Sequence, residues 1–357
     1  PHPRYADETG GIVVDVGYAN SKMGYAGEDM PRVVYSTTFG VAAGAAAGED
    51  GVTSRATAAS ITSHGAGAPA SSAASAAASA SGSAGVSGRA ISCGISPRVA
   101  HAGMEVRSPL DLGIVEDWDA MERVWEHGFQ TLVRTAELGA HPILLVEPPY
   151  SIEAQREKIA ELMFEKFGVP ALYLARSAAL GAFSVGHASA IVVDMGASCT
   201  RVTPVYDGYA LSKGAHLSEV GGAFLTEAMH HALLRSGAVT DVVPRYALRR
   251  ATAGTSAGGG GGAAGGGGAA AGGGRVPRAD LTRVDVPGVA HSYRTWAEMD
   301  VVDDLKKTVC EVHETGFDEA FHAPLQAYEL PDGTTLKVGD LRMQIPELHF
   351  RNEAVEH

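Results

Sequence analysis

The chain has 357 residues, 45% of them hydrophobic, which is enough for two or three domains with real cores. Its formal net charge of −13 argues against a protein that grips nucleic acid with its whole surface. Three widely spaced cysteines exclude a disulfide framework and a Cys-x-x-Cys zinc site, and no run of 18 apolar residues predicts a membrane span.

The first predicted element is a strand–turn–strand unit. Residues 12–17 read Ile-Val-Val-Asp-Val-Gly, a β-branched run that favours a buried strand and ends in an acidic residue and a glycine. A polar stretch and a second apolar run, 23–26, follow, and another strand is expected over 33–35. Residues 42–98 are then predicted to be an insertion, because from 42 to 90 the composition is almost entirely Ala, Ser and Gly.

Helices and strands alternate in the next part of the chain. Apolar residues at three- and four-residue spacings predict a helix over 117–134. A strand follows at 143–146, and Ser151 is expected to cap the next helix. A strand at 171–174 and a small-residue helix complete the pattern, which predicts an α/β fold.

The opening hexapeptide then returns. Residues 191–196 read Ile-Val-Val-Asp-Met-Gly, and a second apolar run follows at 202–206. Gly221 and Gly222 open a helix, where they form either an anion site made of free N–H groups or simply a tight loop.

The last third holds a second insertion, 251–275, that is nearly pure Gly and Ala. The arginines that flank it form either a basic patch or, as the acidic chain favours, a solvated loop. A helix over 298–312 and a strand over 326–330 follow. The flanking arginines are Arg245, Arg249, Arg250, Arg275, Arg278 and Arg283.

The duplicated hairpins suggest a chemistry. Small-residue turns expose N–H groups that can cradle phosphate oxygens, and a carboxylate at each strand tip can hold Mg²⁺ through water. Two such hairpins facing each other would grip a nucleoside triphosphate. The alternative is that Asp15 and Asp194, with their glycines, only punctuate buried strands. The adjacent His230 and His231 build no metal site, and no G-x-S-x-G elbow supports a hydrolase.

The two hairpins resemble the paired phosphate loops of the actin superfamily. Segments 24–32, 155–158, 162–165, 207–209 and 328–333 are similar to actin-type blocks. Further blocks resemble the nuclear actin-related branch of that family, and they are 5–8, 104–110, 115–119 and 244–246. The resemblance implies a two-lobed actin-like α/β fold of the ribonuclease-H type, with a first lobe over 1–186 and a second, incomplete lobe over 187–357, truncated at the C-terminus.

The resemblance also implies a site for ATP with Mg²⁺. Residues matching the first loop are Asp15, Gly17 and Lys22, and those matching the second are Asp194, Gly196 and Thr200. Gly221 and Gly222 lie where the family places a glycine near the nucleotide, and Lys306 matches a lysine on the adenosine side. Asp15 and Asp194 would hold Mg²⁺ through water.

Several residues depart from the family pattern. Tyr18 and Ala19 stand where conventional actins have Ser-Gly, and Ala197 and Ser198 replace Asp-Gly. Ser177 occupies the position of the glutamine that orients the attacking water in actins. No catalytic residue is therefore predicted, and hydrolysis should be very weak or absent. The insertion at 42–98 replaces a region that contributes filament contacts in actin.

The resemblance therefore implies a non-catalytic nuclear subunit of chromatin-remodelling or histone-acetyltransferase complexes that binds ATP structurally. Its expected partners are actin, a helical segment of the remodeller's ATPase subunit and other chromatin-complex subunits, with no membrane and no strong direct nucleic-acid binding. Two alternatives stay open, namely an actin-like cytoskeletal protein that binds ATP, and a weak ATPase or sugar-kinase relative.

Overall fold

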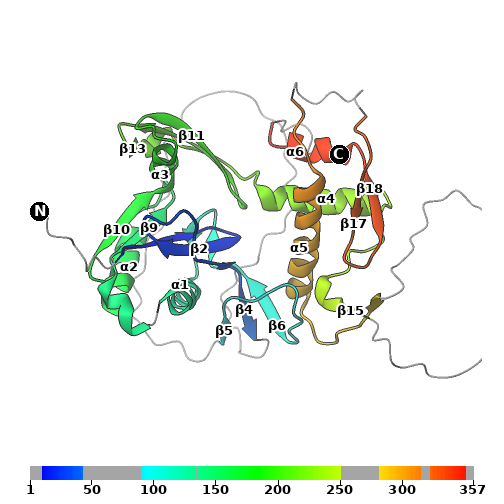
Figure 1. Ribbon diagram of the computed structural model, residues 1–357, viewed down its shortest axis with the longest axis horizontal. Helices are drawn as coiled ribbons and strands as arrows, with labels where there is room; N and C mark the ends of the chain where they lie inside the picture. The colour runs from blue at the N-terminus through cyan, green and yellow to red at the C-terminus, as the bar shows by residue number, and fades with distance from the viewer. Residues whose placement is uncertain (1–9, 43–89, 134, 251–280, 315–321, 351–357) are drawn as a thin grey trace, which may run out of the picture.

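The computed structural model describes residues 10–42, 90–133, 135–250, 281–314 and 322–350. In Figure 1 the elements form two groups, one around a five-stranded sheet and one around three helices and a β-hairpin. The predicted insertions lie largely outside the described residues. Residues 90–98, which fall within the first predicted insertion, are described and carry the short strand β5 (Ile91–Ser92).

The first sheet has the order β10–β9–β1–β2–β3. Strand β1 pairs antiparallel with β2 and parallel with β9, and this confirms the predicted hairpin. Because β1 lies in the middle of the sheet, Ile12 and Val14 on one face are fully buried, while Val13 and Val16 are half-buried. The strands are β1 (Ile12–Val16), β2 (Asn20–Tyr25), β3 (Val33–Ser36), β9 (Ile143–Glu147) and β10 (Leu172–Arg176).

Helix α1 (Trp118–Leu132) covers this sheet and confirms the helix predicted from apolar spacing. It begins after Asp117, whose carboxylate accepts a hydrogen bond from the N–H of Ala120 at 3.0 Å. Its residues Trp125 and Phe129 are buried in the core between this helix and the sheet.

Helix α2 (Glu153–Glu161) begins one residue later than predicted. Its N-cap is Ile152 without a side-chain hydrogen bond, so the cap predicted at Ser151 is wrong. The helix continues as a π-helical turn (Leu162–Lys166) and ends at Gly168, whose φ of 65° suits a residue without a Cβ. Helix α3 (Ser177–Ser184) follows β10 directly.

The second copy of the hexapeptide lies in the sheet β11–β12–β13, in which β14 also pairs with β12. One face packs against α3 through small residues, which include Ala178 and Ala182. The opposite face of β11 carries Ile191, Val193 and Met195, all exposed in the described structure. The strands are β11 (Ala190–Met195), β12 (Thr200–Tyr206), β13 (Tyr209–Ala210) and β14 (His216–Ser218), with a 3₁₀ turn at Ser212–Gly214.

The second group packs α4 (Gly222–Arg235), α5 (His291–Val309) and α6 (Leu341–Glu347) against the hairpin of β17 (Gln326–Glu329) and β18 (Thr335–Val338). Helix α5 begins seven residues before the predicted start at 298. Its first turns bury Tyr293 and Ala297 in a separate cluster with Tyr246, although these residues precede Val301 at four-residue spacings and extend the same apolar stripe. The predicted end at 312 is three residues too late.

Short strands complete the described structure. They are β4 (Phe39–Ala42), β6 (Met104–Arg107), β7 (Leu110–Asp111), β8 (Ile114–Val115), β15 (Leu248–Arg250) and β16 (Leu281–Arg283), with 3₁₀ turns at Thr135–Ala140 and Arg245–Ala247. Contacts cross the predicted lobe boundary at 186/187, since β11 and β12 pack on α3 and β6 packs on α5. The division into lobes stays a prediction. Within the described ranges, none of the helices combines the length and apolar character that a bilayer span requires.

Candidate nucleotide site

The two hairpins place the same charge pattern at the same register. In the first, Asp15 faces Lys22 across the β1–β2 ladder, and its carboxylate lies 3.7 Å from the Lys22 ammonium. In the second, Asp194 faces Arg201 across the β11–β12 ladder, with Oδ2 and Nη1 3.4 Å apart. Each predicted carboxylate is therefore paired with a cationic side chain on the neighbouring strand, seven residues further along the chain.

The turns of the two hairpins also match. The N–H of Gly17 donates to the carbonyl of Asn20 at 3.1 Å, and the N–H of Gly196 donates to the carbonyl of Cys199 at 2.9 Å. A Cβ at either glycine would lie 3.1 Å from that carbonyl oxygen. Both glycines thus lie at the same tight approach within a four-residue turn, where a Cβ would force the carbonyl to shift slightly.

Asp15 and Asp194 lie close enough to influence each other. Burial is the largest cause of the raised pKa of Asp15, the charge of Asp194 raises it further, and Lys22 and Arg201 oppose the shift. The tips of both hairpins, predicted from sequence as paired loops, therefore lie within electrostatic range of each other.

The second loop packs tightly on the start of helix α4. The N–H of Gly222 donates to the carbonyl of Gly196 at 2.9 Å, and the N–H of Ala223 donates to that of Ala197 at 2.8 Å. A Cβ at Gly221 would come within 2.6 Å of the Cys199 nitrogen. Of the two interpretations of this glycine pair, the geometry favours the tight loop, because two N–H groups of the helix start are already used.

Thr200 and Lys306 reinforce this junction. The Thr200 hydroxyl donates to the carbonyl of Val220 at 2.7 Å. The buried ammonium of Lys306, from α5, donates to the Gly222 carbonyl at 2.6 Å and to the Thr226 hydroxyl at 2.8 Å, and pairs with Asp303 at 2.9 Å. These three contacts match the three donors of an ammonium, so Lys306 joins α5 to α4 beside the second loop.

Two departures from the actin pattern take defined positions. Tyr18, in the first turn, packs against the core under the first sheet, and burial is the main cause of its raised pKa, with Asp111 and Glu227 adding to it. Its ring is therefore accommodated by the fold rather than left in solvent. Ser177 is the half-buried first residue of α3, directly after β10.

Arg201 was not predicted from sequence, although the spacing Asp15–Lys22 recurs in Asp194–Arg201 and could have identified it. Its Nε donates to the Tyr150 hydroxyl at 2.9 Å and its Nη2 to the Leu112 carbonyl at 3.1 Å. Burial works to lower its pKa, but Tyr150, Cys199 and Asp194 outweigh that effect and the net shift is upward. Arg201 is thus a fixed cation within the site.

The residues fit Mg²⁺ only in part. Oxygen ligands are present in Asp15 and Asp194, and a magnesium ion commonly reaches carboxylates through water. Each carboxylate, however, already has a cationic partner within 4 Å. No cluster of three or more potential metal-ligating side chains occurs among the residues that the structure describes.

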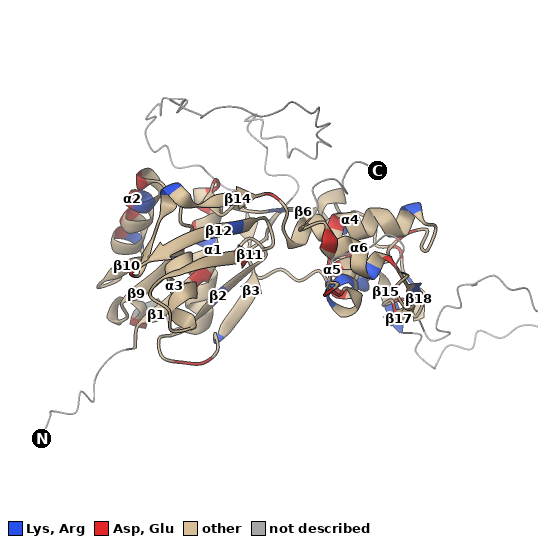
Figure 2. Ribbon diagram, turned by 90° about the horizontal axis from the view of Figure 1, so that it is seen from above, with Lys and Arg blue, Asp and Glu red and all other residues tan. Residues whose placement is uncertain are grey.

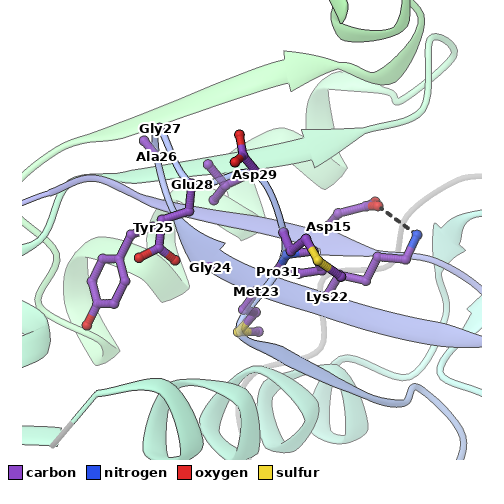
Figure 3. A pocket seen from close by; sticks show the side chains of 12 residues that line it. Asp15, Lys22, Met23, Gly24, Tyr25, Ala26, Gly27, Glu28, Asp29 and Pro31 are labelled. Carbon is purple, nitrogen blue, oxygen red and sulfur yellow. Dashed lines mark ion pairs between the residues drawn. The ribbon is translucent and has the colours of Figure 1, made fainter.

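A hollow lies beside the first hairpin. All of its lining residues fall between Val13 and Pro31, and Figure 3 shows Lys22 reaching toward Asp15 at one end of it. Asp15 and Lys22 line this hollow but no residue of the second hairpin does, so it is not a space between the two hairpins. We assign it no part in nucleotide binding.

Among the described arginines around the second insertion, Arg245 and Arg283 form ion pairs, whereas Arg249 donates to the backbone carbonyls of Tyr246 and Leu248. Arg245 bridges Asp300 at 2.6 Å and Asp304 at 2.8 Å, and Arg283 pairs with Asp241 at 2.5 Å. Figure 2 likewise shows basic and acidic residues intermingled around α4, α5 and α6. Arg275 and Arg278 lie outside the described residues. Around Arg245 and Arg283 the positive charge is thus compensated by acidic neighbours.

Comparison with known proteins decides the family. The family model described as Actin matches residues 6–357. The chain belongs to the actin family. Among curated proteins, it is 38% identical to Actin-related protein 4 of Arabidopsis thaliana over 352 residues, covering 98% of this chain and 71% of that protein.

Other relatives carry the same name. The chain is 36% identical to Actin-related protein 4 of Oryza sativa subsp. indica over 348 residues, covering 96% of this chain and 70% of that protein. It is 28% identical to Actin-related protein 4 of Yarrowia lipolytica over 347 residues, covering 97% and 68%. The sequence-based assignment to the actin superfamily and to an actin-like α/β fold is therefore confirmed.

Proposed function

We propose that this actin-family protein is a non-catalytic nuclear subunit of chromatin-remodelling or histone-acetyltransferase complexes, and that it binds ATP as a structural ligand. The observation that carries the ATP part is the convergence of the duplicated hairpins. Asp15 and Asp194 interact across one site, and the second loop is joined to α4 through Gly196 and Gly222.

The site favours holding a nucleotide over hydrolysing it. Ser177 stands where the family places a water-orienting glutamine, and a serine side chain is shorter by two heavy atoms along its chain. General-base catalysis requires a group within hydrogen-bond reach of the attacking water. We therefore propose very slow or absent turnover, with the bound ATP stabilising the contact between the two hairpins.

The partners are proposed from the relatives and from the charge distribution. The relatives are named Actin-related protein 4, and the nuclear branch resembled by this chain implies actin, a helical segment of a remodeller's ATPase subunit and other chromatin-complex subunits. Arg245 and Arg283 are neutralised by acidic neighbours. This pairing, with the net charge of −13, supports the absence of strong direct nucleic-acid binding.

Affinity purification from nuclear extract tests the proposal. The tagged chain would be captured, its native size measured, and its partners identified by mass spectrometry. Recovery with actin and a remodeller or acetyltransferase subunit in one large species is the expected result. A monomer, or a partner set of cytoskeletal proteins that sediments with actin filaments, would contradict it.

A further inference from the structure

The second hairpin carries a cation that is fixed more firmly than its counterpart in the first. Arg201 and Lys22 occupy equivalent register positions, each opposite the aspartate of its hairpin. The Lys22 side chain is 52% exposed, whereas the Arg201 side chain is 14% exposed. The second repeat therefore holds its positive charge in a preset position.

Three groups fix the position of the Arg201 side chain, two from outside the hairpin and one on the facing strand. The Arg201 guanidinium binds the Tyr150 hydroxyl, the Leu112 carbonyl and the Asp194 carboxylate. Tyr150 also donates to the Leu112 carbonyl, so the two side chains share one acceptor. Leu112 has a φ of 46°, and a Cβ at Gly113 would come within 2.6 Å of Nη2. The β7–β8 turn is thus shaped around this guanidinium.

The charge balance of the site depends on Arg201. Two carboxylates and two cations lie at the hairpin tips, so this cluster is neutral as it stands. Without Arg201 it would carry one excess negative charge, which would oppose a triphosphate unless a divalent cation compensated it. With Arg201, the charge of Asp194 is already balanced by a side chain of the protein at the place where Mg²⁺ would otherwise be needed.

The guanidinium also has donors to spare. Arginine carries five N–H groups in a planar fork, which suits phosphate oxygens. Within the described residues, one N–H on Nε, one on Nη1 and one on Nη2 are used in the contacts above. One N–H on each Nη is left for an acceptor from a ligand.

We propose that Arg201 binds the nucleotide phosphates in the place of Mg²⁺ beside Asp194, so that ATP binding by this protein depends little on divalent cations. This inference rests on the proposed binding of ATP. One side chain would thereby supply a positive charge that the actin-like pattern assigns to the metal ion.

The test compares ATP affinity with Mg²⁺ and with EDTA, by equilibrium dialysis of the full chain. Wild-type affinity is expected to change by no more than about threefold, because a charged hydrogen bond supplied by Arg201 replaces the ion. Arg201→Thr is expected to lose about tenfold to 100-fold in EDTA and to recover in Mg²⁺. Arg201→Lys, which keeps the charge without the fork, should fall between them.

Arg123→Thr is the matched control, because Arg123 forms an exposed pair with Glu126 on α1. Circular dichroism melting reports whether each variant is folded, and the wild-type comparison stands even where a variant is not. A wild type that binds ATP only with Mg²⁺, or an Arg201→Thr variant that binds equally well in EDTA, would overturn the role of Arg201 while leaving ATP binding in place. Absence of binding under both conditions would remove the proposed ATP binding and this inference together.

Discussion

The two hairpins begin with nearly the same hexapeptide, yet their apolar residues meet opposite environments. Ile12 and Val14 of β1 are fully buried, whereas Ile191 is 73% exposed and Val193 55% exposed. The strand pairing, the turn hydrogen bond and the aspartate–cation pair are the same in both. Local sequence thus determines the hairpin, and the surrounding elements determine what its side chains contribute to stability.

The difference follows from what packs on each strand. Strand β1 lies between β2 and β9, and α1 covers the face that carries Ile12 and Val14. Strand β11 is at the edge of its sheet, and α3 covers the face opposite Ile191 and Val193. In the described structure, the first hairpin is part of a core and the second is covered on one face only.

Matched alanine substitutions should show the largest contrast. Ile12→Ala removes a fully buried side chain from a packed core and should lower the free energy of unfolding by about 2–5 kcal/mol. Ile191→Ala, at the equivalent position, should change it by less than about 0.5 kcal/mol. Urea titration followed by circular dichroism measures both, and equal losses would show that Ile191 is covered in solution.

The second largest contrast is expected between the ion pairs of the two sheets. Glu147, at the end of β9, is buried between Arg156 and Arg176, each 3.2 Å away. Its carboxylate oxygens have no well-aligned hydrogen bond within the described residues, so charge attraction is its main interaction. Glu147→Gln should cost about 2 kcal/mol, because two guanidinium groups lose their shared anion.

Asp194→Asn is the comparison, since Asp194 is half-exposed. It should cost less than about 1 kcal/mol, because solvent screens the pair with Arg201. The same urea titrations report both values. A larger loss for Asp194→Asn than for Glu147→Gln would reverse the expected order.

The turn glycines should behave alike, which tests the shared geometry of the hairpins. Gly17→Ala and Gly196→Ala each place a Cβ 3.1 Å from a carbonyl oxygen, and each should lower the free energy of unfolding by about 1 kcal/mol. The two shifts should agree within the error of thermal melts. A neutral effect at one glycine and a large effect at the other would mean that the turns are not equivalent.

The smallest effect concerns pH. Since the pKa of Asp15 is raised in the folded protein, chiefly by burial, the folded state binds its proton more tightly than the unfolded state. The stability that this group contributes is therefore fully present below its ordinary pKa of 3.8. It is lost as the pH rises through the raised pKa of the folded protein. Asp15→Asn should be more stable than wild type above that window, by less than about 1 kcal/mol because the carboxylate is half-exposed.

Urea titrations at several pH values measure this difference. The advantage of Asp15→Asn should disappear at acidic pH, where the wild-type carboxyl is protonated. An advantage that grows as the pH falls would contradict the sign of the shift.

Much of the fold could be predicted from sequence because its signals are local. The β-branched runs at β1 and β11 and the apolar stripe of α1 gave the correct elements. The start of α5 was missed, although Tyr293 and Ala297 precede Val301 at four-residue spacings and extend the same apolar stripe. Burial of β1 against exposure of β11 depends on tertiary packing and has no signature in a shared hexapeptide.

The candidate site was predictable in its carboxylates and glycines but not in its contacts. The register that pairs Asp194 with Arg201 comes from the ladder, and the contacts of Arg201 with Tyr150 and Leu112 join segments far apart in the chain. Likewise, the role of Gly221 depends on how closely α4 approaches Cys199. Such close approaches arise only once the elements are packed.

Whether the paired hairpins hold ATP without turning it over can be measured with labelled nucleotide. The purified chain would be incubated with ATP labelled at the γ-phosphate, separated from free nucleotide, and its bound label identified by chromatography over several hours. We expect the label to be bound stoichiometrically and to be still ATP. An absence of bound label, or its steady release as inorganic phosphate, would contradict it.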